Sequence, residues 1–158
     1  WGEGSVYETL NMSKLWELPL VVIVENNNIS QTTPSLLNRA GTIEGRVRGF
    51  NIDYISIISR DVWECRELTA PSIEKVRQKS GPLVIEFETD RLGSHSKGDD
   101  TRPLELIKKI KKNDWFWALQ EKYPEQFHRI LPMVQERIEK LAQEISSRPF
   151  SSWSGYEN

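Results

Sequence analysis

Residues 20–28 read Leu20-Val21-Val22-Ile23-Val24-Glu25-Asn26-Asn27-Asn28, an apolar run followed at once by a polar, asparagine-rich segment. A short run of β-branched residues bounded by such a segment is typical of a buried strand. Two more runs of this kind occupy residues 54–58 (YISII) and 83–87 (LVIEF). Because helical stretches separate the three runs, the sequence predicts an α/β fold with a parallel sheet flanked by helices.

The predicted helices of this part of the chain cover residues 7–16, 42–48 and 61–79. Asp61 followed by Glu64 has the pattern of a capped helix start. Pro71 lies inside the last stretch, where proline removes a backbone donor, so we expect a kink or two shorter helices there.

The character of the sequence changes after the third strand. Residues 90–102 are polar and contain glycine without any period, which predicts a loop. The rest is expected to be helical, with one apolar face. That face consists of Ile130, Val134, Ile138, Leu141 and Ile145. We expect a domain over residues 1–145 and an irregular tail over residues 146–158.

Composition excludes several classes of protein. The net charge of −2 gives no field that would recruit nucleic acid, so we expect no nucleic-acid partner. The longest apolar run, residues 18–24, is too short to cross a bilayer, which takes about 20 residues, so we expect no membrane span. Cys65 is the single cysteine, which excludes an internal disulfide and permits a reducing compartment. The chain begins at Trp1, and we expect it to be a piece of something longer.

Two polar segments form the first candidate site. Gly2-Glu3-Gly4 opens the chain, and Glu25-Asn26-Asn27-Asn28 follows the first strand. Loops at the carboxyl edge of a parallel sheet are where such folds bind ligands. A carboxylate and a carboxamide meeting there would offer oxygen ligands to magnesium, which in turn bridges a diphosphate. The alternative is that the asparagines merely form a turn, which asparagine favours.

This pairing resembles the thiamine-diphosphate motif, Gly-Asp-Gly followed by Asn-Asn. Residues 11–28 together resemble the alpha subunit of the thiamine-diphosphate-dependent 2-oxoacid dehydrogenases. The resemblance implies a thiamine-diphosphate-binding fold and the cofactors thiamine diphosphate and magnesium. It implies that Glu3, Asn27 and the main-chain carbonyl of Ile29 hold the metal, and that Gly2, Gly4 and Asn27 contact the cofactor.

The sequence departs from the family's motif in two ways. Glu3 stands where the family has aspartate, which moves the carboxylate one methylene away from the backbone. Only 21 residues lie between Gly4 and Asn26, fewer than in the family. Either part of the cofactor cradle has been lost or residues are missing from the sequence.

The second candidate site is the loop Arg91-Leu92-Gly93-Ser94-His95-Ser96-Lys97-Gly98-Asp99-Asp100, which resembles the family's Arg-x-x-x-His-Ser-x-x-Asp segment. The resemblance implies that His95 is catalytic, since an imidazole near a 2-oxoacid can relay protons. Arg91 and Ser96 are expected on the cofactor side, and Arg91 and Asp99 are expected to stiffen the loop. Ser96 also matches a serine that kinases modify in some members. The alternative for His95 is simple surface exposure.

The function implied by the resemblance is part of the decarboxylating component of a 2-oxoacid dehydrogenase, inactive alone. That component decarboxylates a 2-oxoacid and transfers the acyl group reductively to a lipoyl carrier. The expected partners are a beta-type subunit or fused second domain, the lipoyl acyltransferase and the 2-oxoacid, in the cytoplasm or, in a eukaryote, the mitochondrial matrix. Two alternatives remain open: a non-catalytic assembly module with a degenerate site, and an acetoin-type or biosynthetic thiamine enzyme.

Overall fold

The computed structural model describes residues 1–151. These residues divide into two compact units, Trp1–Trp115 and the part that begins at Phe116. The predicted domain, residues 1–145, therefore spans both units, and each unit is described by itself.

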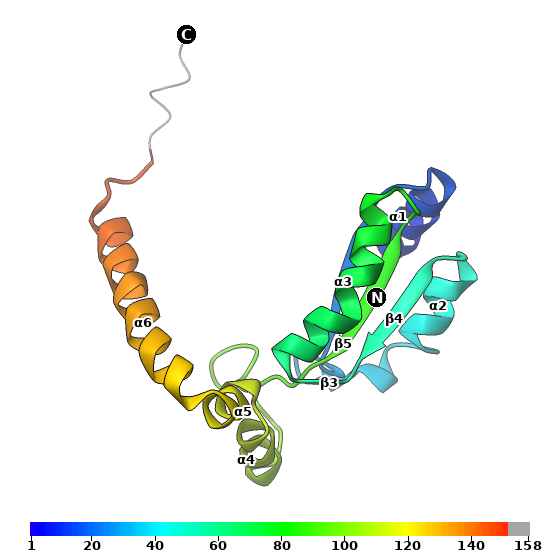
Figure 1. Ribbon diagram of the computed structural model, residues 1–158. Coiled ribbons are helices and arrows are strands. Elements are labelled where there is room, and N and C mark those ends of the chain that lie inside the picture. Colours follow the sequence, from blue (N-terminus) through cyan, green and yellow to red (C-terminus); the bar gives the residue numbers. More distant parts are fainter. Residues whose placement is uncertain (152–158) are drawn as a thin grey trace. The chain divides into compact units, whose positions relative to one another are not determined.

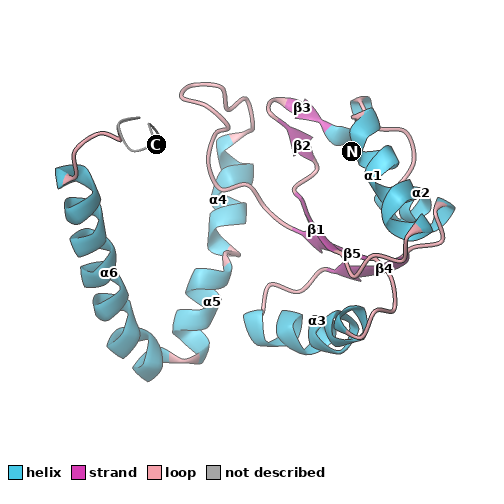
Figure 2. Cartoon of the chain, turned by 90° about the horizontal axis from the view of Figure 1, so that it is seen from above, coloured by secondary structure: helices cyan, strands magenta, loops and turns pink. Residues whose placement is uncertain are grey.

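The first unit alternates helices with short strands, most of them labelled in Figure 1, and β1 and β2 in Figure 2. Its elements are α1 (Gly4–Leu15), β1 (Val21–Asn26), β2 (Ile29–Ser30), β3 (Thr33–Pro34), the 3₁₀ helix η1 (Ser35–Leu37), α2 (Ile43–Gly49), β4 (Asp53–Ile57), α3 (Val62–Arg77), β5 (Leu83–Glu88) and α4 (Leu104–Lys112). The three predicted strands are β1, β4 and β5, and they form a parallel sheet in the order β1-β5-β4. The predicted α/β architecture is thereby confirmed.

Helices cover both faces of this sheet, with α1 and α2 on one face and α3 on the other (Figure 2). Successive side chains of a strand point to opposite faces of the sheet. Val84 and Ile85 of β5, both fully buried, therefore pack into two different cores. Val84 packs in the cluster that holds Leu10 of α1 and Val47 of α2. Ile85 packs in the cluster that holds Val76 of α3. Each fully buried side chain of this kind stabilises the fold by about 1.5–3 kcal/mol.

Helix α3 begins as predicted but does not break at its proline. The Asp61 carboxylate accepts from the backbone N–H of Trp63 (2.9 Å) and of Glu64 (3.3 Å), which confirms the predicted cap. Of the two outcomes expected at Pro71, two shorter helices is wrong, because α3 runs as one helix through the exposed Pro71, and the kink stays a prediction. Packing of Val76 into the core beyond the proline holds the two halves in one helix.

Two other boundaries differ from prediction. Helix α1 begins at Gly4, three residues before the predicted start, so the glycine motif runs directly into a helix. The boundary between the units falls at the start of α5 (Trp115–Lys122), which is followed in the second unit by α6 (Pro124–Ser147). The predicted irregular tail therefore begins two residues late, at 148, and residues 152–158 lie outside the described part of the chain.

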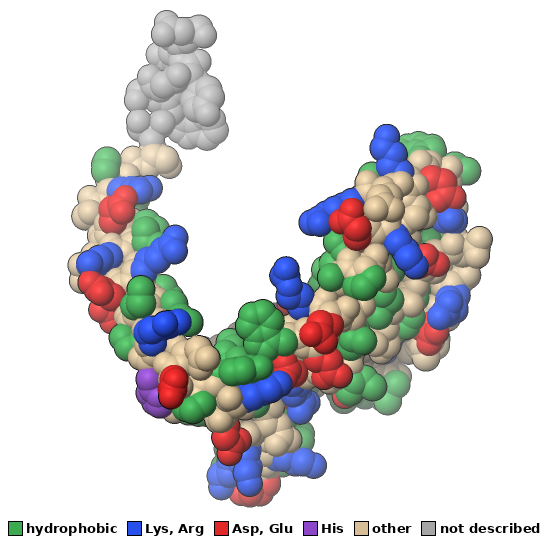
Figure 3. Space-filling view, viewed as in Figure 1, with side chains coloured by type: hydrophobic (Ala, Val, Ile, Leu, Met, Phe, Trp, Pro, Cys, Tyr) green, Lys and Arg blue, Asp and Glu red, His purple; other side chains and the backbone are tan. Residues whose placement is uncertain are grey.

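The apolar face predicted for the last helix lies on α6. Its five residues are 43 to 61% exposed, so the described elements of the second unit leave this face largely uncovered. Figure 3 shows apolar side chains among charged ones along α6. No helix in residues 1–151 is long and apolar enough to cross a membrane.

Candidate functional site

The carboxyl edge of the sheet carries a hollow of about 520 Å³. Its walls come from the chain start, the end of β1, the β2–β3 hairpin, η1 and the start of α2. Four predicted site residues line it: Gly2, Glu3, Asn27 and Ile29. Gly4, the first residue of α1, does not. The structure therefore brings the two motifs together, although Gly2-Glu3 and Asn27 lie far apart in the sequence.

The asparagines form the turn that was one interpretation of the sequence. The side-chain carbonyl of Asn26 accepts from the N–H of Asn28 (3.1 Å), and that of Asn27 accepts from the N–H of Ile29 (3.1 Å). Asn28 has a φ of 58°, the left-handed conformation that asparagine tolerates better than most residues. The same turn exposes Asn27 to the hollow, so the turn and the binding interpretations are compatible.

The chain start is held against α2 by hydrogen bonds to the carbonyl of Trp1. The Tyr7 hydroxyl donates to this oxygen (2.6 Å), and so does the Arg46 guanidinium (2.7 Å). Arg46 donates as well to the carbonyl of Ala40 (3.1 Å). These bonds hold the backbone next to Gly2 and Glu3 at the wall of the hollow.

The atoms around the hollow suit magnesium, which prefers oxygen ligands. Glu3 contributes a carboxylate, and Asn27 and Ile29 contribute an amide and a main-chain carbonyl. Pro34 lies opposite Ile29 in the β2–β3 pair and has no N–H, so it cannot occupy the Ile29 carbonyl. Glu25 also lines the hollow and adds a second carboxylate that sequence reasoning did not assign. Across the described residues, no three His, Cys, Asp or Glu side chains are grouped to hold a metal by themselves.

Behind the turn lies a polar cluster that sequence reasoning missed. Glu86 of the central strand β5 accepts hydrogen bonds from the Asn26 amide (2.7 Å) and the Tyr54 hydroxyl (2.7 Å). Burial, with the Glu86 carboxylate beside it, raises the pKa of Tyr54 to about 12. The phenol therefore stays protonated and donating. The only sequence signal was a glutamate inside an otherwise apolar strand.

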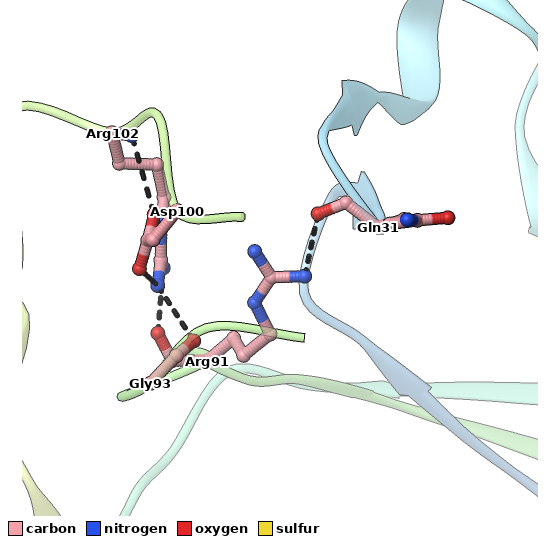
Figure 4. Close-up of polar contacts among 5 residues, drawn as sticks. All are labelled: Gln31, Arg91, Gly93, Asp100 and Arg102. Carbon is pink, nitrogen blue, oxygen red and sulfur yellow. Dashed lines mark hydrogen bonds and ion pairs between the residues drawn. The ribbon is translucent and has the colours of Figure 1, made fainter. Parts of the chain in front are cut away.

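A second hollow, of about 500 Å³, lies beyond Asn27 at the same edge. Asn27 and Arg91 both line it, together with the ion pair between Arg60 and Asp90. The Arg91 guanidinium donates to the carbonyl of Gln31 in the hairpin that follows Asn27 (2.7 Å; Figure 4). Arg91 therefore joins the second predicted segment to the first.

Asp99 does not stiffen the loop as expected, because its buried carboxylate oxygens have no hydrogen-bond partner in the described part of the chain. The pair of Arg102 and Asp100 stiffens the loop instead. Arg102 donates to both oxygens of Asp100 (2.9 and 2.8 Å) and to the carbonyls of Arg91 (2.6 Å) and Gly93 (2.9 Å; Figure 4). The hydrogen bonds from Arg102 lower the pKa of Asp100 to about 2. Arg91 instead donates to the carbonyl of Gln31, outside the loop.

His95 and Ser96 lie on the exposed part of this loop. The His95 side chain is 56% exposed, and its Nδ1 lies 3.0 Å from the Ser96 hydroxyl and 3.7 Å from the Asp99 carboxylate. Neither residue lines either hollow. In this structure, His95 has the surface position that was the alternative to its catalytic role.

A parallel sheet with oxygen ligands and an asparagine turn at its carboxyl edge is the arrangement expected of a thiamine-diphosphate-binding protein. The comparison with known sequences agrees with this class. The chain belongs to the Dehydrogenase E1 component family, whose sequence profile matches residues 1–147. The resemblance read from the motifs is thereby confirmed, and with it the thiamine-diphosphate dependence of the family.

Within the family, the similar proteins are alpha subunits. The pyruvate dehydrogenase E1 alpha subunit of Zymomonas mobilis is 32% identical over 70% of this chain and 32% of its own length. The testis-specific mitochondrial form from Rattus norvegicus is 30% identical over 93% of this chain and 40% of its own. The alpha subunit of an acetoin:2,6-dichlorophenolindophenol oxidoreductase from Bacillus subtilis is 30% identical over 61% of this chain and 29% of its own. The chain thus spans less than half the length of these relatives.

Proposed function

We propose that this chain supplies the diphosphate- and magnesium-binding part of the decarboxylating component of a 2-oxoacid dehydrogenase. One observation carries the proposal: Glu3, Asn27 and Ile29, each of which has an oxygen that can bind a metal, line one hollow at the carboxyl edge of the sheet. These three positions are the ones that the family motif assigns to the metal.

The chain's own residues would bind and orient the cofactor. Helix α1 begins beside the hollow, and its first N–H groups favour a phosphate. A Cβ added at Gly2 or Gly4 would meet no atom within 4 Å, so protein packing does not explain the glycines, whereas backbone approach to a diphosphate does. When bound, thiamine diphosphate supplies the carbanion chemistry, while the protein provides orientation and electrostatics.

The remaining parts of the function need other chains. The relatives are named alpha subunits, which implies partner subunits. We propose a beta-type subunit or a fused second domain that holds the aminopyrimidine ring, and a lipoyl acyltransferase that accepts the acyl group. His95 would act on the 2-oxoacid in the complete assembly. The related proteins come from bacteria and mitochondria, which supports the cytoplasm or the mitochondrial matrix as the location.

Calorimetry with thiamine diphosphate on the complete assembly, with and without magnesium, tests the metal site. Asn27→Ala removes one proposed ligand and should weaken magnesium-dependent binding by roughly 10-fold or more, since metal affinity depends on each ligand. Asn11→Ala, which changes an exposed asparagine of α1, is the matched control and should bind like the parent. Equal affinity of the Asn27→Ala variant and the parent, or binding that ignores magnesium, would remove the metal site and favour a non-catalytic assembly module.

A second candidate function is acetoin cleavage, which the similarity to the acetoin-oxidising subunit favours. An artificial-electron-acceptor assay of the complete assembly with a 2-oxoacid and with acetoin separates the two candidates. If the electron acceptor is reduced faster with acetoin than with the 2-oxoacid, acetoin cleavage becomes the proposed function.

A further inference from the structure

The side chain of Asn26, which opens the turn that presents Asn27, is hydrogen-bonded to a carboxylate of the central strand. We infer that Glu86 is a positioning residue, which acts through Asn26 to hold the Asn26–Ile29 turn in the shape that presents the Asn27 side chain to the hollow. This inference rests on the proposed function for its consequence in metal binding, but the hydrogen bonds that carry it belong to the protein alone.

Glu86 lies in the middle strand of the three-stranded sheet. Central strand β5 pairs with β1 on one side and β4 on the other, and Glu86 lies opposite Val24 and Ser56. Asn26 and Tyr54 are each two residues along from those partners, on the same face, where long side chains reach diagonally across a sheet. One half-buried carboxylate therefore receives a hydrogen bond from each neighbouring strand.

Glu86 fixes the orientation of the Asn26 side-chain amide. An ionised carboxylate only accepts hydrogen bonds, so Asn26 must direct its NH₂ group at Glu86. Its carbonyl oxygen then points the other way, where it accepts from the N–H of Asn28. With the amide reversed, NH₂ would face N–H and the bond to Asn28 would be lost.

The hydrogen bond between Asn28 and Asn26 also fixes the two proposed metal ligands that follow Asn26. The bond holds Asn28 in its left-handed conformation, and the next one, from the N–H of Ile29 to Asn27, closes the turn. Asn27 and Ile29 are both proposed ligands. A change of the Asn26 amide would therefore move two of the three oxygens around the metal.

The experiment changes the acceptor without changing its size. Glu86→Gln leaves one acceptor oxygen for two donors and presents an NH₂ group to one of them. Magnesium-dependent binding of thiamine diphosphate to the complete assembly should weaken roughly 10- to 100-fold, the usual effect of losing a partner of a metal ligand. In the unliganded assembly, backbone hydrogen exchange over residues 26–30 should become faster. Tyr54→Phe, which removes the other hydrogen bond of the same carboxylate, is the matched control and should change affinity by less than about 2-fold.

A double substitution distinguishes positioning from general loss of structure. If Glu86 acts through Asn26, then in an Asn26→Ala background Glu86→Gln should add less than about a 2-fold further loss of affinity. Equal affinity and equal exchange in Glu86→Gln and the parent would overturn the inference, and so would a full additional loss in the Asn26→Ala background. If Glu86→Gln does not fold, Glu86→Asp, which draws the carboxylate away from Asn26, takes its place. A parent that binds no cofactor would refute the proposed function, and the exchange comparison would still decide the role of Glu86.

Discussion

Arg102 illustrates how one side chain can order a segment that has no secondary structure. It donates hydrogen bonds to both oxygens of Asp100 and to the carbonyls of Arg91 and Gly93 at the start of the loop. The two ends of residues 91–102 are therefore held together. The motif that identified the loop ended at Asp100, and Arg102 was therefore not assigned a role. Its contribution depends on a bidentate geometry that spacing alone does not reveal.

The loop should loosen in acid. The pKa of Asp100 is about 2 in the fold against an ordinary 3.8, so the pair contributes stability above about pH 4 that is lost as the pH falls towards 2. Pepsin digestion between pH 4.5 and 2 should show rising cleavage within residues 91–102 in the parent. Asp100→Asn should be cleaved readily already at pH 4.5, whereas Asp53→Asn, an exposed control, should follow the parent. A parent whose loop cleavage does not change with pH would contradict this account.

His95 should affect turnover and not folding. Its side chain is mostly exposed, so His95→Ala removes little buried area and should leave the Tm nearly unchanged. The 2-oxoacid decarboxylation rate of the complete assembly should fall by roughly 10²-fold, typical of lost acid–base catalysis. His128→Ala, which changes the exposed histidine of α6, is the control. A rate equal to that of the parent would leave His95 as a surface residue.

At the scale of elements, prediction succeeded where an apolar run was long enough to fill a strand. β1, β4 and β5 were predicted correctly because each is a run of five or six residues rich in β-branched side chains. The cap of α3 was predicted because Asp61 stands at the start of the helix. β2 and β3 were missed, since two residues carry no period. The Asn26–Glu86 bond was missed for another reason: its partners are 60 residues apart, and only the pairing of β1 with β5 brings them together.

Helix α3 should become more stable without its proline. Pro71 cannot donate to the carbonyl of Glu67, and a proline inside a helix costs about 3 kcal/mol relative to alanine. Because Pro71 is exposed and leaves no cavity, Pro71→Ala should raise the stability by roughly 1–3 kcal/mol, or the Tm by several degrees. Differential scanning calorimetry checks this against Arg66→Ala, an exposed control on the same helix. A lower Tm for Pro71→Ala would mean that the ring makes packing contacts that alanine cannot replace.

At the scale of the whole molecule, the apolar face of α6, which its own unit leaves largely uncovered, predicts association. Exposed apolar patches above a few hundred Å² usually mark an interface. The purified chain should therefore associate in light scattering and show no decarboxylase activity without a partner. Ile138→Glu, in the middle of that face, should reduce association, whereas Glu136→Gln, a polar exchange on the same helix, should not. A monodisperse parent that turns over a 2-oxoacid unaided would disprove the need for a partner.

The strand order β1-β5-β4 also constrains when this unit can fold. Among the strands of the described residues, β1 and β4 do not pair with each other, and each pairs with β5, the last of the three to be synthesised. Pairings between strands so distant in sequence have high contact order and form slowly, because the intervening chain must first lose its freedom. Among the described strands, the three-stranded sheet can therefore form only after β5, which ends at Glu88, has been synthesised, whereas the short β2–β3 pair can form before it.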